Sequence, residues 1–252
     1  MEAHSLSVLS KLLAGPRFTD LTFVCEGQEI NVHKAIVCIQ SPVIDKSANN
    51  KFFIEGREGR VKMDGFDLPI VKLMVEYMYT GQYSIPTHET SPKSSIDTQQ
   101  AESEDSGSML SPHATTLLVL QQHVRLNTIA EYYDIPRLRS MANRKIVDIL
   151  GRSDLPTSVL PHILREAHDL TRDKELTQIL ASTTANHLGA LLADENFRSL
   201  EFMQDDFGNR LLFSCAQLIS IAERKAHDRT QEALKALKTR KSQHVVQYRP
   251  SW

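Results

Sequence analysis

The stretch from Asn31 to Pro42, NVHKAIVCIQSP, places a histidine, a lysine, a cysteine and a serine within nine positions. Residues of these types can form a nucleophile and base pair or bind a metal ion. Cys25, His33 and Cys38 have the spacing C-x7-H-x4-C, which is no recognised zinc-ligand spacing and has no fourth ligand nearby. We therefore expect no metal site in this stretch.

Cys38 is better explained by packing than by catalysis. Helical spacing places it on one face with Ala35 and Ile39, which predicts a small buried apolar side chain. His33 lies where a strand gives way to a helix, and an imidazole there can satisfy unpaired backbone groups. Because no nucleophile, base and orienting group occur together, we predict a protein that is not an enzyme and has no cofactor.

Composition limits the partners and the compartment. The chain has 252 residues, of which 41% are apolar, and a formal charge of −2. This balance argues against nucleic acid as a partner, and no apolar run approaches the ~18 residues that span a bilayer. Three cysteines without paired spacing favour a reducing compartment, so we expect the cytoplasm or the nucleus. The apolar stretch 6–14 has no basic region before it, and we expect no secretory signal and no membrane partner.

The elements that would position these residues begin with a helix over 5–13 and a hairpin. One face of the helix carries Leu6, Leu9 and Leu13, and the following Gly15-Pro16 is typical of a helix end. The stretch DLTFVCEGQEINVH alternates apolar and polar residues and turns near Gly27, which predicts a β-hairpin.

Further signals continue this mixture of strands and helices. Ser41 followed by Pro42 predicts an N-cap and the first turn of a helix. A third strand is expected over 60–63, and a helix from Phe66 has a glycine C-cap at Gly81.

A composition shift interrupts the pattern over residues 84–113. This segment is rich in serine, threonine and proline, lacks aromatic residues, and has five acidic residues against one lysine. Such a segment cannot bury enough apolar surface to offset the entropy of ordering it. We predict a disordered insertion that is a spacer, or a phosphorylation segment in which Ser91 and Ser111 precede proline.

Five stretches, FTDLTFVC, INVHKAIVCIQSPVI, FFIEG, VKMDGFDLPIVKLMVEYMYTGQY and IAEYYDIPRLRSMANRKI, occur in this order over residues 5–150. Together they resemble a BTB/POZ domain of the fungal type. The resemblance implies an α+β fold, a helical cluster capped by a small β-sheet, and a role in protein association. We divide the chain into a first part of this domain (5–83), the insertion (84–113), its C-terminal helices (114–150), an all-α region (151–240) and a basic tail (241–252).

The resemblance also implies roles for individual residues. The apolar stripe of Leu6, Leu9 and Leu13, on a helix too short to be stable alone, predicts a homodimer interface. The resemblance adds Asp20 and Lys34 to that interface. For the last two, a charged pocket near that interface competes with a simpler interpretation, in which Asp20 caps local backbone and Lys34 is solvated. His33, Tyr79 and Gly81 are the structural signature of the domain.

FFIEG contains an apolar residue, any residue and a glutamate, the pattern through which some BTB proteins bind cullins. Phe53 and Glu55 are therefore the cullin-binding candidates, although at least one of Phe52 and Phe53 is also expected to pack into the helical core. The predicted function is a self-associating adaptor of a cullin-type ubiquitin ligase for an unknown client. The alternatives are a nuclear transcriptional co-regulator or scaffold, and an adaptor of the Skp or elongin kind.

The second half shows apolar helical stripes but no kelch repeat and no C2H2 zinc-finger spacing. One stripe runs from Leu176 to Leu191 and the other from Leu211 to Ala222, and both are interpreted as core. Residues 235–249 include five basic residues and no acid, which is typical of a solvated helix end.

Overall fold

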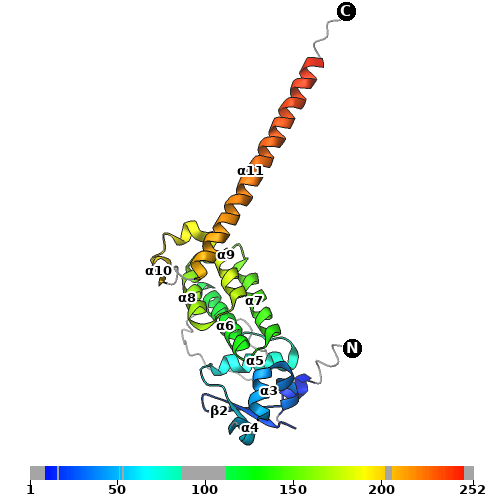
Figure 1. Cartoon of the computed structure of the whole chain (residues 1–252), viewed down its shortest axis with the longest axis vertical. Coiled ribbons are helices and arrows are strands. Elements are labelled where there is room, and N and C mark those ends of the chain that lie inside the picture. Colours follow the sequence, from blue (N-terminus) through cyan, green and yellow to red (C-terminus); the bar gives the residue numbers. More distant parts are fainter. Residues whose placement is uncertain are drawn as a thin grey trace, which may run out of the picture.

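A computed structural model describes residues 9–15, 17–50, 52, 54–86, 112–201 and 206–246, with side chains described up to residue 236. The chain forms a small sheet surrounded by short helices, then a helical stack from which one long helix projects (Figure 1). The predicted α+β fold with an all-helical C-terminal region is confirmed.

The sheet has three strands in the order β2-β1-β3. β1 (Leu21–Cys25) pairs antiparallel with β2 (Gln28–Val32), and the turn between them has positive φ at Glu26 (49°) and Gly27 (75°). Two positive φ angles match the right-handed twist of a two-residue hairpin, so the predicted hairpin is confirmed. β3 (Arg60–Lys62) is the expected third strand and runs parallel to β1.

Four short helices surround the sheet: α2 (Lys34–Gln40), α3 (Pro42–Asn49), α4 (Ile54–Glu58) and α5 (Leu68–Thr80). The predicted caps are present. Ser41 Oγ accepts the Ile44 N–H at 3.1 Å before Pro42, and Gly81 ends α5 in the left-handed conformation at φ 70°. A glycine adopts this conformation without the steric cost that a Cβ atom would bring.

The predicted apolar face of α2 is wrong. Val37 is the buried residue of this helix, Ile36 and Cys38 are half-buried against the core, and Ala35 and Ile39 face solvent. Ile39 is 85% exposed. In a helix of seven residues, rotation by one position is enough to exchange the buried and exposed faces, and the sequence alone does not fix that rotation.

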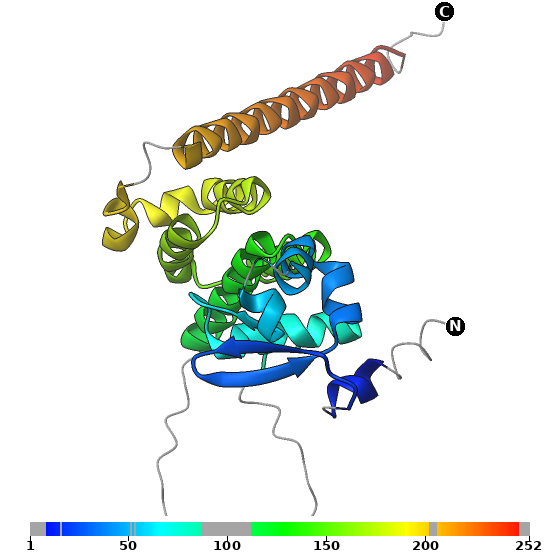
Figure 2. The same cartoon turned by 60° about the horizontal axis from the view of Figure 1, so that its bottom comes forward.

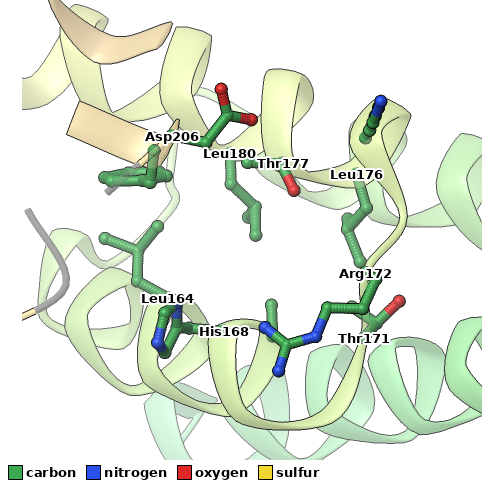
Figure 3. Close-up of a pocket in the computed structure, with 11 residues that line it drawn as sticks. Leu164, His168, Thr171, Arg172, Leu176, Thr177, Leu180 and Asp206 are labelled. Atoms are coloured by element: carbon green, nitrogen blue, oxygen red, sulfur yellow. The ribbon is translucent and has the colours of Figure 1, made fainter. Parts of the chain in front are cut away.

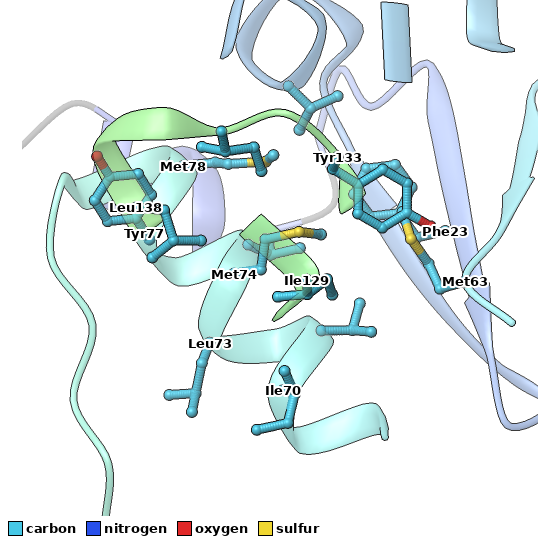
Figure 4. Packing of buried hydrophobic residues seen from close by; sticks show 14 of the residues in the cluster. Phe23, Met63, Ile70, Leu73, Met74, Tyr77, Met78, Ile129, Tyr133 and Leu138 are labelled. Atoms are coloured by element: carbon cyan, nitrogen blue, oxygen red, sulfur yellow. The ribbon is translucent and has the colours of Figure 1, made fainter. Parts of the chain in front are cut away.

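The first hydrophobic core joins the sheet to α5 and to the facing parts of two later helices. Phe23, Met63, Met74, Ile129 and Tyr133 meet there (Figure 4). The same core also contains Leu126, Leu138 and Ala142, which belong to helices that continue beyond it. Burial of this apolar surface is the main contribution to stability of this half of the chain.

α6 (Pro112–Tyr132) and α7 (Pro136–Leu150) form an antiparallel pair that enters two cores. Leu126 and Ile129 lie in the first core, whereas Leu120 and Val124 of the same helix lie in the second. α7 is shared in the same way, with Leu138 in the first core and Ile146, Ile149 and Leu150 in the second. The division predicted after residue 150 stays a prediction, but α6 and α7 belong to both packed regions.

The second core is completed by η1 (Thr157–Val159), α8 (Leu160–Leu170), α9 (Lys174–Leu191), α10 (Glu195–Arg198) and the start of α11 (Asp206–Val246). α11 has 41 residues, so it is about 60 Å long. Phe207, Leu211 and Ser214 pack beside α9, whereas residues 221–236 are exposed and project away from the sheet (Figures 1 and 2). None of the described helices is apolar over a length that would cross a membrane.

Three predicted boundaries shift. Ile85, at the start of the predicted insertion, packs on the first core, and Pro112 begins α6, so residues 112–113 are helical. Residues 87–111 lie outside the described part of the chain. α11 continues to Val246, past the predicted start of the tail at residue 241.

Candidate functional site

The N-terminal helix is the first element of the predicted association surface. Residues 9–13 are helical, and Leu12, which the predicted stripe omits, packs against the first core. Leu9 is half-buried, Leu13 is 38% exposed, and Leu6 lies outside the described residues. The helix is thus attached to its own domain through Leu12 and leaves Leu13 at the surface, where a partner can contact it.

Asp20 and Lys34 meet through the backbone. Asp20 Oδ1 accepts the Lys34 N–H at 2.7 Å, and the Asp20 N–H donates to the Val32 carbonyl at 3.2 Å. Lys34 is the first residue of α2, so this carboxylate satisfies one of the unpaired amides at the helix start. The interpretation of Asp20 as a backbone cap is therefore confirmed, and its role in a dimer interface stays a prediction.

His33 is held between α5 and the N-terminal segment. Its Nε2 lies 2.9 Å from the Arg17 carbonyl, and its Nδ1 lies 2.6 Å from the Tyr79 hydroxyl. Because a carbonyl only accepts, Nε2 carries a proton, and in the neutral ring Tyr79 donates to Nδ1. The Tyr79 oxygen in turn accepts the His33 N–H at 2.9 Å, and burial raises the pKa of Tyr79. The pair ties the end of β2 to α5.

Both ring nitrogens of His33 are therefore engaged within the fold, and the thiols on either side of it have separate surroundings. Cys25 is buried and donates to the Phe66 carbonyl at 3.2 Å. Burial also raises the pKa of Cys25 and of Cys38, which disfavours the thiolate form that a nucleophile requires. Among the described residues, no group of three or more His, Cys, Asp or Glu side chains is arranged to hold a metal ion.

The FFIEG segment lies on the surface around α4. Phe52 is 96% exposed and Ile54 is 59% exposed, so Phe52 is not the phenylalanine of this segment that packs into the core. Glu55 is half-buried in the first turn of α4, and Phe53 lies outside the described residues. Gly56 permits this arrangement, because a Cβ atom there would collide with the Asn50 carbonyl at the end of α3.

A buried polar network, which the sequence reasoning missed, joins α6 and α7 to the loop before α9. Asn127 and Asn143 both donate to Asp173 Oδ2, at 2.7 and 2.9 Å, and Asn127 also donates to Asn143 at 2.8 Å. Thr171 Oγ1 lies 2.9 Å from Asn127 Oδ1 and 2.7 Å from Glu131 Oε2, and its single hydroxyl proton is shared between these two acceptors. Burial opposes ionisation of Asp173, but the hydrogen bonds from Asn143, Asn127 and the Glu175 amide outweigh it and lower its pKa.

A second cluster lies where the described chain leaves the first core. Tyr83 OH is 2.9 Å from His123 Nδ1, and Lys145 Nζ donates to the Tyr83 carbonyl at 2.8 Å and lies 3.7 Å from the centre of its ring. Burial, with a smaller effect of the Lys145 charge, lowers the pKa of His123 to about 4. His123 is therefore neutral near pH 7, and the cluster fixes the segment after α5 against α6 and α7.

Arg125 links the two cores at the surface. Its Nε donates to Glu166 at 2.8 Å and its Nη1 donates to Asp67, the N-cap residue of α5, at 2.7 Å. One guanidinium therefore connects the start of α5 to α6 and α8. Glu166 Oε2 is buried and has no hydrogen-bond partner among the described residues. With the Asp173 network, this bridge makes the sheet domain and the helical region one connected body that presents surfaces on both sides.

A match to a family model agrees with the predicted domain type. Residues 9–95 match the family model of the BTB/POZ domain. Among solved structures, the chain is similar to the BTB (Tramtrack and Bric a brac) domain of human gigaxonin. The two are 20% identical over 56% of this chain and 87% of that chain, with a TM-score of 0.35.

Proposed function

The chain contains a BTB/POZ domain over residues 9–95, and on this premise we propose that the protein is a self-associating adaptor for a cullin-type ubiquitin ligase. BTB/POZ domains are protein-protein interaction modules and are generally not enzymes. The finer assignment to the fungal type belongs to the same proposal and is supported by the stretch VEYMYTGQY over residues 75–83.

The surface around α4 is the observation that carries the cullin assignment. Phe52 and Ile54 expose apolar side chains on either side of Phe53, and Glu55 is accessible beside them. Large apolar residues grouped at a surface mark protein interaction sites. A cullin would cover these side chains and donate a charge-assisted hydrogen bond to the Glu55 carboxylate.

Binding to cullin N-terminal domains, measured by calorimetry, tests this assignment. Glu55→Arg should weaken binding about tenfold or more, whereas Glu58→Arg, the same change at an exposed position of the same helix, should not. Melting temperatures of both variants show whether Glu55→Arg acts through the fold. If the parent protein binds no cullin of its own organism, the ligase role is rejected and a nuclear scaffold or co-regulator takes its place.

Self-association is proposed through the helix over residues 9–13. Light scattering should give a dimer mass for the parent and a monomer mass for a Leu9→Glu, Leu13→Glu variant. Leu234→Glu, at a 51% exposed position of α11, is the control and should leave the mass unchanged. A monomeric parent, or a dimeric double variant, would place association elsewhere or remove it.

We place the protein in the cytoplasm or the nucleus, which the three unpaired thiols of Cys25, Cys38 and Cys215 support. Fluorescence microscopy of the tagged chain tests this placement. Strong nuclear enrichment without cullin binding would favour the co-regulator.

A further inference from the structure

A cavity of about 300 Å³ opens between α8, α9 and the start of α11 (Figure 3). Its floor is apolar and consists of side chains that also belong to the second core: Leu164, Leu176, Leu180 and Phe207. The core of the helical region therefore reaches the surface here instead of being covered. An apolar floor of this kind gains free energy when another apolar group displaces its water.

The rim of this cavity is positively charged. Arg172 and Lys174 lie on it together with His168, and Asp206 lies on the opposite side of the opening as drawn in Figure 3. The Asp206 charge is balanced by Arg210, whose Nε lies 2.6 Å from Oδ2. Arg172 and Lys174 are exposed, and neither makes an ion pair within the described part of the chain. Arg172 and Lys174 are therefore two cationic groups of the opening that no described ion pair balances.

The loop that carries this charge is held rigidly. On one side of Arg172, Thr171 bonds to Asn127 and Glu131, and the Arg172 N–H itself donates to Glu131 at 3.0 Å. On the other side, Asp173 accepts hydrogen bonds from two asparagines and from the Glu175 N–H at 3.0 Å. The backbone under the guanidinium therefore needs no ordering when a partner binds, which removes part of the entropic cost of association.

We infer that this cavity is a docking site for a segment of a partner protein that presents one apolar side chain flanked by acidic residues. The apolar side chain enters the cavity, and the carboxylates pair with Arg172 and Lys174 at its rim. Two cations beside an apolar hollow do not form the extended basic track that a nucleic-acid backbone requires. The inference deepens the proposed adaptor function, on which it rests for the identity of the partner as a client.

Selection of a random dodecapeptide phage library on the immobilised full chain tests this inference. The selected peptides should combine a leucine, isoleucine, methionine or phenylalanine with neighbouring aspartate or glutamate. Their affinity, measured by fluorescence polarisation, should fall as salt is added, because the rim charges are exposed. Selected peptides without acidic residues would overturn the proposed chemistry.

Variants assign the binding to this cavity. An Arg172→Glu, Lys174→Glu variant changes only exposed side chains and should weaken the selected peptide tenfold or more. Thr177→Phe, at a half-buried position that lines the cavity, should block entry of the apolar side chain. The matched control is Lys225→Glu, Arg229→Glu, the same charge change on the exposed part of α11, which should bind as the parent does. Unchanged binding by the rim variant overturns the inference, whatever the stability of Thr177→Phe.

Cullin binding measured on the same samples separates the two proposals. Loss of peptide binding with cullin binding intact is expected for the rim variant. A parent chain that binds a cullin but selects no peptide rejects the docking site alone. A parent chain that selects acidic peptides but binds no cullin rejects the ligase role and leaves the docking site in place.

Discussion

Replacement of His123 by asparagine should remove part of the pH dependence of stability. His123 is 4% exposed, and its pKa is lowered to about 4 from the ordinary value of 6.5. Between these values the unfolded chain binds a proton that the folded protein does not. The free energy of unfolding therefore falls as the pH falls from 6.5 towards 4. Above pH 6.5, His123 is neutral in both states and causes no such loss of stability.

The size of the effect follows from the two pKa values. Linkage gives a loss of about 2 kcal/mol between pH 7 and pH 5 for this one group. That is a large fraction of the stability of a typical domain, about 5 to 15 kcal/mol. The lowered pKa of Asp173 places its titration below this window, so it contributes little to the change between pH 7 and pH 5.

Urea unfolding followed by far-UV circular dichroism at pH 5, 6, 7 and 8 measures the effect. His123→Asn keeps a polar atom near the position of Nδ1, which faces Tyr83, but it does not titrate. The difference in free energy of unfolding between parent and variant should change by about 2 kcal/mol between pH 7 and pH 5, because the other groups titrate equally in both proteins. Parallel curves for parent and variant would refute the lowered pKa. Lys145→Met should reduce the loss of stability between pH 7 and pH 5, because it removes a positive charge that disfavours protonation of His123.

Three further changes test other parts of the structure. Asn143→Leu removes a hydrogen-bond donor from buried Asp173 and should lower the free energy of unfolding in urea by about 3 kcal/mol. Asn209→Leu, at an exposed site, should lower it little. Equal effects of the two changes would show that the network is not buried. Gly56→Ala should lower the free energy of unfolding by about 1 to 3 kcal/mol, because its Cβ atom meets the Asn50 carbonyl. Gly189→Ala, with open space around it, should be neutral or stabilising. A Gly56→Ala protein as stable as the parent would contradict the close approach of α3 and α4. Replacement of residues 87–111 by a short Gly-Ser linker should leave the melting temperature nearly unchanged, because loop length contributes weakly to stability. A protein that no longer folds would contradict the assignment of this segment as a spacer.

The sequence was sufficient to predict elements whose signals are local. The hairpin at Gly27, the Ser41-Pro42 cap and the glycine C-cap at Gly81 each depend on neighbouring residues, and each is observed. The exposed face of α2 and the attachment through Leu12 depend on how a short helix is rotated against the rest of the fold. Several rotations satisfy the same short apolar pattern, so these features were assigned incorrectly or omitted.

The polar clusters could not be predicted because their members are far apart in the chain. Asn127 and Asp173 are 46 positions apart, and Tyr83 and His123 are 40 apart across the predicted insertion. Each of these residues occurs in a helical or loop pattern where a solvent-exposed position is equally compatible with the sequence. The cavity beside Arg172 was missed for the same reason, because its lining comes from three helices that the sequence identifies only as apolar stripes.

The sharing of α6 and α7 between two cores has a consequence during synthesis of the chain. When residue 150 has left the ribosome, the first core can close, but Leu120, Val124, Ile146 and Ile149 still await α8, α9 and the start of α11. About 60 more residues must be translated before this surface is covered, which takes several seconds at ordinary elongation rates. During that interval the nascent chain presents an apolar strip to chaperones and to neighbouring nascent chains.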